Sequence, residues 1–163
     1  MIRKMLIANR GEIAVRVIRA CREMDIETVA VYSTADKECL HVQLADHAVC
    51  IGPPPSSKSY LNKDTLITSA LCTGCDAVHP GVGFLSENAD FAREVEKAGM
   101  FWIGPKPDTI EMLGDKVKAR ETAQKSGLPV TPGSAGAITT KEQAAETANK
   151  CGYPVIIKAA SGG

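Results

Sequence analysis

The stretch Met5-Leu6-Ile7-Ala8, followed by Asn9-Arg10-Gly11, decides the fold class. A short run of apolar residues that ends at a glycine-containing turn is typical of a strand covered on both faces. From Gly11 to Met24 the apolar side chains recur with the period of a helix. This stretch therefore predicts the strand–turn–helix unit from which an open α/β sheet is built.

The same alternation of apolar runs and helical segments continues as far as residue 103. Because helical segments connect successive strands, the predicted fold class is α/β, with an open parallel sheet flanked by helices. The predicted strands are 28–32, 48–51, 76–79 and 101–103, and the predicted helices are 40–44, 60–71 and 91–98. In the helix over 60–71, the side chains expected to face the core are Leu61, Thr65, Ile67 and Leu71.

After Pro107 the strand–helix alternation stops. Helices are predicted over 108–114, 115–126 and 140–152, and an apolar strand over 154–158 precedes Ser161-Gly162-Gly163. We expect one α/β domain over residues 1–113 and the beginning of a second domain over residues 114–163. Because a complete domain does not end inside a glycine-rich loop, the chain is expected to be the first part of a longer protein.

Composition excludes several classes of function. The 163 residues carry 19 basic and 19 acidic side chains, so the net charge is zero and a nucleic-acid partner is not expected. The apolar runs are far shorter than the roughly 20 residues that span a bilayer, and no export signal precedes them. Cys72 and Cys75 with His79 form only part of a zinc ligand set, so no metal site is expected. A cytoplasmic protein without a membrane partner is predicted.

Two lysines occupy positions where an anion would be stabilising. Lys116 opens a helix, where the dipole favours negative charge, so it is either an ordinary surface lysine or a phosphate ligand. Lys158 ends an apolar strand, and a buried or half-buried ammonium there needs an anionic partner. Backbone amides of Ser161, Gly162 and Gly163 would face the same anion. Any nucleotide site is not a P-loop, because the Walker spacing is absent.

Two turns at strand ends resemble phosphate-binding loops in part. The turn Asn9–Glu12 contains one glycine, and the loop Gly81-Val82-Gly83 contains two, whereas a dinucleotide fingerprint needs three. A structural turn is the simpler interpretation of each. A dinucleotide-binding domain is therefore an alternative, which stabilisation by NAD but not by ATP would support.

Taken in order, these motifs resemble the N-terminal part of the biotin carboxylases. That family belongs to the ATP-grasp ligases, which use ATP and Mg²⁺ to activate bicarbonate as carboxyphosphate and then carboxylate biotin on a carrier protein. The resemblance implies a Rossmann-like pre-ATP-grasp domain followed by the start of an ATP-grasp domain. It covers essentially the whole chain and is carried by residues 5–14, 29–33, 41–46, 79–88, 101–105, 112–116 and 152–158.

The resemblance also implies roles for particular residues. Lys116 and Lys158 match lysines that contact ATP phosphates, and Ser161-Gly162-Gly163 is similar to the beginning of a mobile lid over ATP. The loop Gly81–Gly83 matches the biotin end of the family's site, where Val82 replaces the usual tyrosine. The family's magnesium-binding glutamates, bicarbonate-binding arginine, general base and adenine pocket lie beyond residue 163. No catalytic residue is therefore expected within this piece, and the piece alone is expected to be inactive.

Charged residues of the first predicted helix suggest a subunit contact. Arg16, Arg19 and Glu23 are similar to the polar face through which bacterial biotin carboxylases form homodimers, although such a stripe is also ordinary on a solvated helix. The further partners implied are a biotin carboxyl carrier protein and carboxyltransferase subunits, in the first half-reaction of acetyl-CoA carboxylase in fatty acid synthesis. Alternatives are the corresponding domain of a pyruvate or other acyl-CoA carboxylase, and a non-catalytic dimerisation or docking module.

Overall fold

The computed structural model of the chain describes residues 1–134 and 136–158, apart from the side chain of Lys116. By internal contacts the chain forms two compact units, Met1–Pro107 and Asp108–Gly163.

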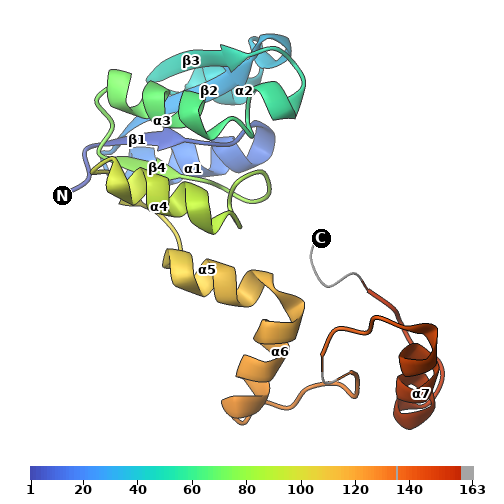
Figure 1. The fold of residues 1–163 in the computed structure, drawn as a ribbon. Helices are drawn as coiled ribbons and strands as arrows, with labels where there is room; N and C mark the ends of the chain where they lie inside the picture. The colour runs from blue at the N-terminus through green and yellow to red at the C-terminus, as the bar shows by residue number, and fades with distance from the viewer. Residues whose placement is uncertain (135, 159–163) are drawn as a thin grey trace. The chain divides into compact units, whose positions relative to one another are not determined.

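The first unit contains a five-stranded parallel sheet, as predicted (Figure 1). The strand order is β3-β2-β1-β4-β5, and Leu6 of the central strand pairs with Val29 on one side and Val78 on the other. These three side chains are at most 1% exposed, because helices cover both faces of the sheet. The strands are β1 (Lys4–Ile7), β2 (Glu27–Ser33), β3 (His47–Gly52), β4 (Ala77–His79) and β5 (Phe101–Trp102).

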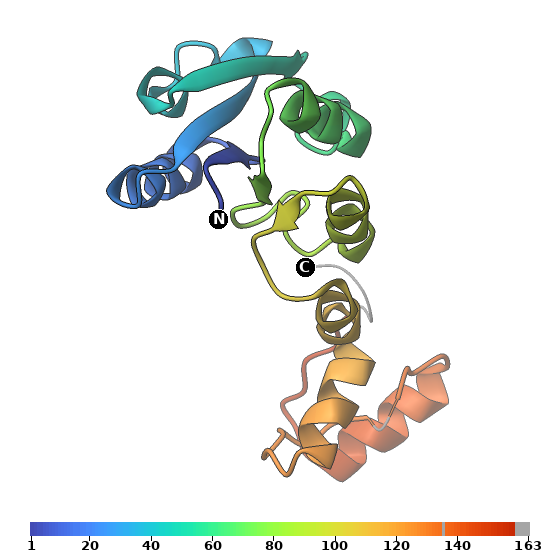
Figure 2. The same ribbon diagram turned by 90° about the vertical axis from the view of Figure 1, so that its left-hand side faces the viewer.

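Four helices cover the sheet in two layers. Figure 2 shows α1 (Gly11–Glu23) and α2 (Leu40–Leu44) on one face, with α3 (Lys63–Cys72) and α4 (Ala89–Lys97) on the other. On α4 the side chains of Phe91 and Val95 are fully buried, and the Phe91 ring meets Trp102 edge-on at 5.6 Å between centroids. Two short 3-10 turns, η1 (Thr34–Asp36) and η2 (Ser56–Lys58), complete the connections.

The prediction of which side chains of α3 face the core is wrong. Its buried residues are Leu66, Ser69 and Ala70, whereas Leu61 and Leu71 are 40% and 52% exposed. The helix begins at Lys63 rather than at residue 60, because the Asn62 side chain accepts a hydrogen bond from the Thr65 amide (3.1 Å) and caps it. Apolar residues occur on more than one side of this helix, so periodicity alone does not identify the buried side.

The second unit, in its described part, is helical. It contains α5 (Pro107–Gly114), α6 (Lys116–Lys125) and α7 (Lys141–Cys151). Thr140 caps the last helix, because its hydroxyl accepts a hydrogen bond from the Gln143 amide at 3.2 Å. Asp115 caps α6 by accepting hydrogen bonds from two backbone amides, those of Val117 and Lys118.

The predicted strand over 154–158 is not observed. Ile156 and Ile157 are 83% and 85% exposed, and Lys158 is exposed rather than half-buried. A strand needs a neighbouring strand to take its backbone hydrogen bonds, and within residues 136–158 no segment supplies one. The predicted lid residues Ser161, Gly162 and Gly163 lie outside the described residues.

Among the helices of the described segments, none combines the length and the apolar character needed to cross a membrane.

We predict that two leucines of α3 differ sharply in their contribution to stability. Replacing the fully buried Leu66 with alanine should lower the free energy of unfolding by about 2–5 kcal/mol, because it leaves a cavity in the core. Leu71→Ala, on the exposed side of the same helix, should change it by no more than about 0.5 kcal/mol. Urea denaturation measures both, and equal losses would contradict the observed orientation of α3.

Candidate functional site

The strand order creates a switch point between β1 and β4. The chain leaves β1 toward α1 on one face and leaves β4 toward α4 on the other face. In open α/β sheets, ligands bind outside the carboxyl ends of the strands at such a point. Here it is formed by Asn9–Gly11 after β1 and by residues 80–84 after β4.

The side chain of Asn9 fills the gap at this switch point. It is 3% exposed, and its carboxamide nitrogen donates hydrogen bonds to the carbonyl oxygens of Pro80 and Val82, each at 2.9 Å. Its carboxamide oxygen accepts from the Arg10 amide, also at 2.9 Å. In a dinucleotide-binding fold a pyrophosphate would lie in this gap, so its occupation by a side chain argues against that alternative.

The loop after β4 has a backbone that glycine makes possible. Gly81 and Gly83 have φ angles of +69° and +76°, and Phe84 also has a positive φ, of +47°. A Cβ atom on Gly81 would lie only 2.6 Å from the Asn9 carboxamide nitrogen. Between the two glycines, Val82 is 70% exposed. The glycines therefore shape a turn that presents residue 82 to the outside.

His79 is held at the start of this loop. Its Nδ1 accepts a hydrogen bond from the Gly81 amide at 3.0 Å, so the neutral ring carries its proton on Nε2. Burial lowers the pKa of His79, which favours that neutral form. The Gly81 amide is thereby directed inward rather than toward a ligand.

A second group of side chains at this edge was not predicted from the sequence. The rings of Tyr60 and Phe84 stack with centroids 5.0 Å apart, and the Arg10 guanidinium lies 5.2 Å and 5.6 Å from their centroids. Arg10 also pairs with Asp36, whose Oδ2 lies 3.2 Å from Nη1. The polar turn before Asp36 and an arginine just ahead of a helix were the available signals, but neither indicated a partner.

Asp36 is the polar centre of this group. Its Oδ2 accepts hydrogen bonds from the hydroxyls of Ser33 (2.6 Å) and Tyr60 (2.7 Å) as well as from Arg10. Burial acts to raise the pKa of Asp36, but these three hydrogen bonds outweigh it and the pKa is lowered. Asp36 is therefore a carboxylate at neutral pH and holds Arg10 over the two rings.

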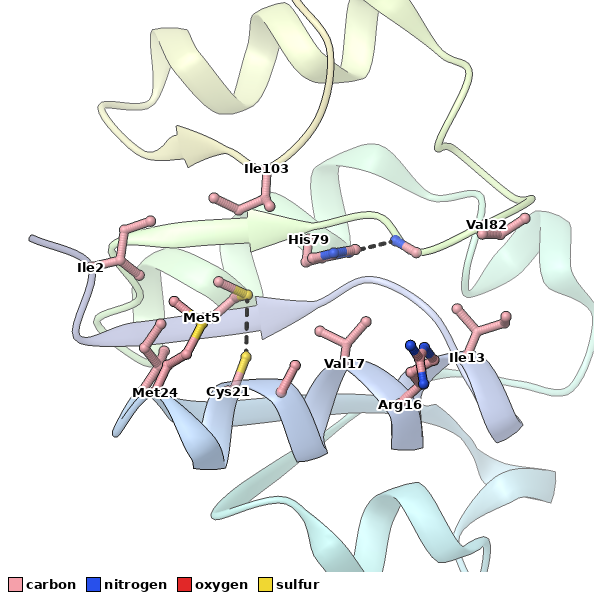
Figure 3. Close-up of a pocket in the computed structure, with 13 residues that line it drawn as sticks. Ile2, Met5, Ile13, Arg16, Val17, Cys21, Met24, His79, Val82 and Ile103 are labelled. Carbon is pink, nitrogen blue, oxygen red and sulfur yellow. Dashed lines mark hydrogen bonds between the residues drawn. The ribbon is translucent and has the colours of Figure 1, made fainter.

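A largely apolar hollow of about 500 Å³ runs along α1, from Ile2 and Met24 near the amino end of β1 to Val82 in the loop after β4 (Figure 3). Arg16 and Val17 of α1 line one side of it, and His79 of β4 and Val82 of the following loop line the other. Two groups of predicted residues thus meet here: Arg16, predicted for a subunit contact, and Gly81 and Val82, predicted for biotin. The other lining residues are Ile2, Met5, Ile13, Ala20, Cys21, Met24, Ile26 and Ile103.

The remaining predicted residues lie elsewhere in the chain. Arg19 and Glu23 are exposed on α1 and do not line the hollow. Lys116 begins α6 and Lys158 is exposed, both in the second unit. Among the described residues, no group of three or more metal-ligating side chains gathers at one place.

A parallel sheet of this order, with a glycine loop fixed at its switch point, defines a Rossmann-like α/β domain. Comparison with known families makes the assignment specific. The model described as "Biotin carboxylase, N-terminal domain" matches residues 1–110, and "Carbamoyl-phosphate synthase L chain, ATP binding domain" matches residues 115–163. The chain belongs to the biotin carboxylase family.

Individual relatives agree with this assignment. Biotin carboxylase 1 of Bacillus subtilis is 59% identical over 163 residues, which is 100% of this chain and 36% of that protein. The biotin carboxylase–βγ-ATP complex of Campylobacter jejuni has a TM-score of 0.95 at 46% identity, covering 100% of this chain and 36% of its own.

A third relative is the biotin carboxylase domain dimer of Hydrogenobacter thermophilus 2-oxoglutarate carboxylase, in complex with MgADP, ADP and bicarbonate. It has a TM-score of 0.95 at 47% identity, again covering 100% of this chain and 36% of its own. The chain therefore spans little more than a third of the length of these relatives.

Proposed function

We propose that this chain is the N-terminal part of a biotin carboxylase, which carboxylates carrier-bound biotin with bicarbonate through carboxyphosphate, using ATP and Mg²⁺. The observation that carries the proposal is the 59% identity to a biotin carboxylase over all 163 residues. The neighbour bound to MgADP and bicarbonate supports the same ligands. We take residues 1–113 as the N-terminal α/β domain and 114–163 as the beginning of the ATP-grasp domain.

Within this function, the two lysines neutralise phosphate charge. Lys116 and Lys158 contact ATP phosphates, where fixed cations stabilise the charge on the transferring phosphoryl group. The exposure of Lys158 leaves its ammonium accessible to such a ligand. Ser161-Gly162-Gly163 begins the lid, whose closure excludes water from the hydrolysable carboxyphosphate. Magnesium ligands and the general base are contributed by residues beyond 163, so the 163-residue piece alone is inactive.

The final acceptor of the carboxyl group is proposed to be acetyl-CoA. The chain would then act in the cytoplasm in the first half-reaction of acetyl-CoA carboxylase, in fatty acid biosynthesis, with a biotin carboxyl carrier protein and carboxyltransferase subunits. The second candidate is a carboxylase of another acceptor, which the 2-oxoglutarate carboxylase neighbour favours. A non-catalytic docking module is less well supported, because Lys116 and Lys158 are both present.

We also propose that α1 forms part of a homodimer interface. Arg16, Arg19 and Glu23 are exposed on this helix, and Arg16 borders the apolar hollow. An apolar surface beside a charged rim is the arrangement that protein–protein interfaces use. The Hydrogenobacter thermophilus neighbour, itself a dimer, supports this role.

The function is tested in an extended protein, in which these 163 residues are followed by the remaining length of the Bacillus subtilis relative. It should hydrolyse ATP in a biotin- and bicarbonate-dependent manner, whereas the 163-residue chain should not. Lys116→Met and Lys158→Met should each lower kcat/KM for ATP by about 10- to 100-fold, because a fixed cation at the phosphates is lost. Phosphate release measures all four proteins.

Two neighbouring lysines serve as matched controls. Lys118→Met lies on the same helix as Lys116, and Lys150→Met removes a lysine paired with Glu146 on the exposed surface of α7. Both should retain the parent's kcat/KM. Turnover by the 163-residue chain, or equal losses in controls and test variants, would contradict the assignment.

Val82→Tyr is predicted to strengthen the binding of free biotin in the extended protein. The exposed position at the loop tip has room for a ring, and an added aromatic contact should lower KM for biotin by about two- to tenfold. The KM for ATP should stay unchanged. Steady-state kinetics with free biotin decides this, and an unchanged KM for biotin would remove residue 82 from the biotin end of the site.

The interface is tested by reversing charge on α1. The double variant Arg16→Glu with Arg19→Glu should raise the dimer Kd of the extended protein by about tenfold or more. The proposed contact surface of each subunit would then carry only negative charges, and the two surfaces would repel each other. Lys97→Glu on α4, which covers the opposite face of the sheet, is the control. Sedimentation equilibrium gives both constants, and an unchanged Kd in the double variant would rule out this surface.

A further inference from the structure

Asn9 has no role in the function proposed above, although its polar side chain is almost completely buried. A buried carboxamide must find partners for both its oxygen and its nitrogen, or folding loses free energy. Asn9 finds them across more than seventy positions of sequence, in Pro80 and Val82, and in the adjacent Arg10 amide. The amide of Arg10 fixes which end of the carboxamide faces the loop.

The two long-range hydrogen bonds of Asn9 end on the backbone on either side of Gly81. They bind the carbonyl oxygens of Pro80 and Val82, so the peptide groups Pro80–Gly81 and Val82–Gly83 are held. Gly81 also packs directly against the carboxamide, where a Cβ atom would come within 2.6 Å. The backbone on both sides of Gly81 is therefore tied to the Asn9 carboxamide.

The far end of the loop is held independently. Phe84 stacks on the fully buried Tyr60 ring, and the Arg10 guanidinium covers both rings. Val82 lies between these two anchors with its side chain 70% exposed. Because the loop backbone is held on both sides of Val82, this exposed side chain is expected to point in one direction only.

We propose that Asn9 is a positioning residue: its carboxamide sets the backbone of the Gly81–Phe84 loop and so the direction in which residue 82 faces the ligand. The identity of that ligand as biotin rests on the proposed function. The positioning itself rests only on the contacts of Asn9. The two parts can therefore be tested separately.

The positioning is tested in the 163-residue chain by ¹⁵N relaxation. In the parent, the amides of Val82 and Gly83 should have order parameters near the rigid value of about 0.85, and Asn9→Ala should lower them below about 0.6. Asn9→Asp provides a second variant of the same size, which keeps the acceptor for Arg10 but loses both donors. Strands β1 and β2 should stay rigid in all proteins.

Thr28→Val is the matched control for general loss of stability. It removes a hydrogen bond of 2.7 Å between the buried Thr28 hydroxyl and Asp46, near the amino end of β2 and away from the loop. It should lower Tm and leave the order parameters of Val82 and Gly83 unchanged. A loop that is equally ordered with and without the Asn9 carboxamide, or already mobile in the parent, would overturn the positioning role.

The consequence for the ligand is measured in the extended protein. Asn9→Ala and Asn9→Asp should raise KM for free biotin about tenfold, while KM for ATP stays within about twofold of the parent. Thr28→Val should change neither constant. A variant that loses kcat and stability while the order parameters of its loop and its KM for biotin both stay at the parent's values would show a merely structural Asn9 and overturn the proposal.

Failure of the proposed function gives a different result. A parent extended protein without biotin-dependent ATP hydrolysis would contradict biotin carboxylation, and the relaxation measurement alone would then decide whether Asn9 positions the loop. If the loop loosens in Asn9→Ala while KM for biotin is unchanged, the positioning survives and biotin is not its ligand.

Discussion

The geometry of the candidate site depends on the contact between one buried carboxamide and the backbone of the loop after β4. Asn9 lies where the connections from β1 and β4 diverge to opposite faces of the sheet, and its hydrogen bonds close the gap that this divergence opens. Many open α/β sheets leave the gap for the phosphates of a ligand. With Asn9 in that gap, the open surfaces beside it are the tip of the loop, at Val82, and the hollow along α1.

The fold could be predicted from the sequence because its signals are local. Strands covered on both faces appear as uninterrupted apolar runs, and the cap of the last helix appears as a threonine three residues ahead of a glutamine. The prediction failed where local pattern was ambiguous or insufficient. On α3, Leu66 and Leu71 are equally apolar, and only packing against the sheet decides between them. Residues 154–158 have the composition of a strand, but a strand also requires a neighbour.

The site was only partly visible in the sequence for a related reason. The two glycines around Val82 mark an unusual turn, and a turn is a local feature. The partner of that turn is Asn9, more than seventy positions away, and the two meet because β1 pairs with β4 rather than with β3. The stack of Arg10, Tyr60 and Phe84 depends on the same register. A single sequence does not state which strands are neighbours, so a pairing of this kind follows only from the three-dimensional arrangement.

The hydrogen bonds of Asn9 end on main-chain carbonyl oxygens, and this determines what the loop can tolerate. A carbonyl group is the same in every amino acid, so the anchor does not distinguish valine from tyrosine at position 82. The backbone of the loop and the side chain at its tip can therefore change independently. A new side chain at position 82 would point in the same direction as valine, with no change in the hydrogen bonds of Asn9. A substitution at position 82 leaves both hydrogen bonds of Asn9 in place, whereas any residue with a Cβ atom at position 81 would collide with the Asn9 carboxamide.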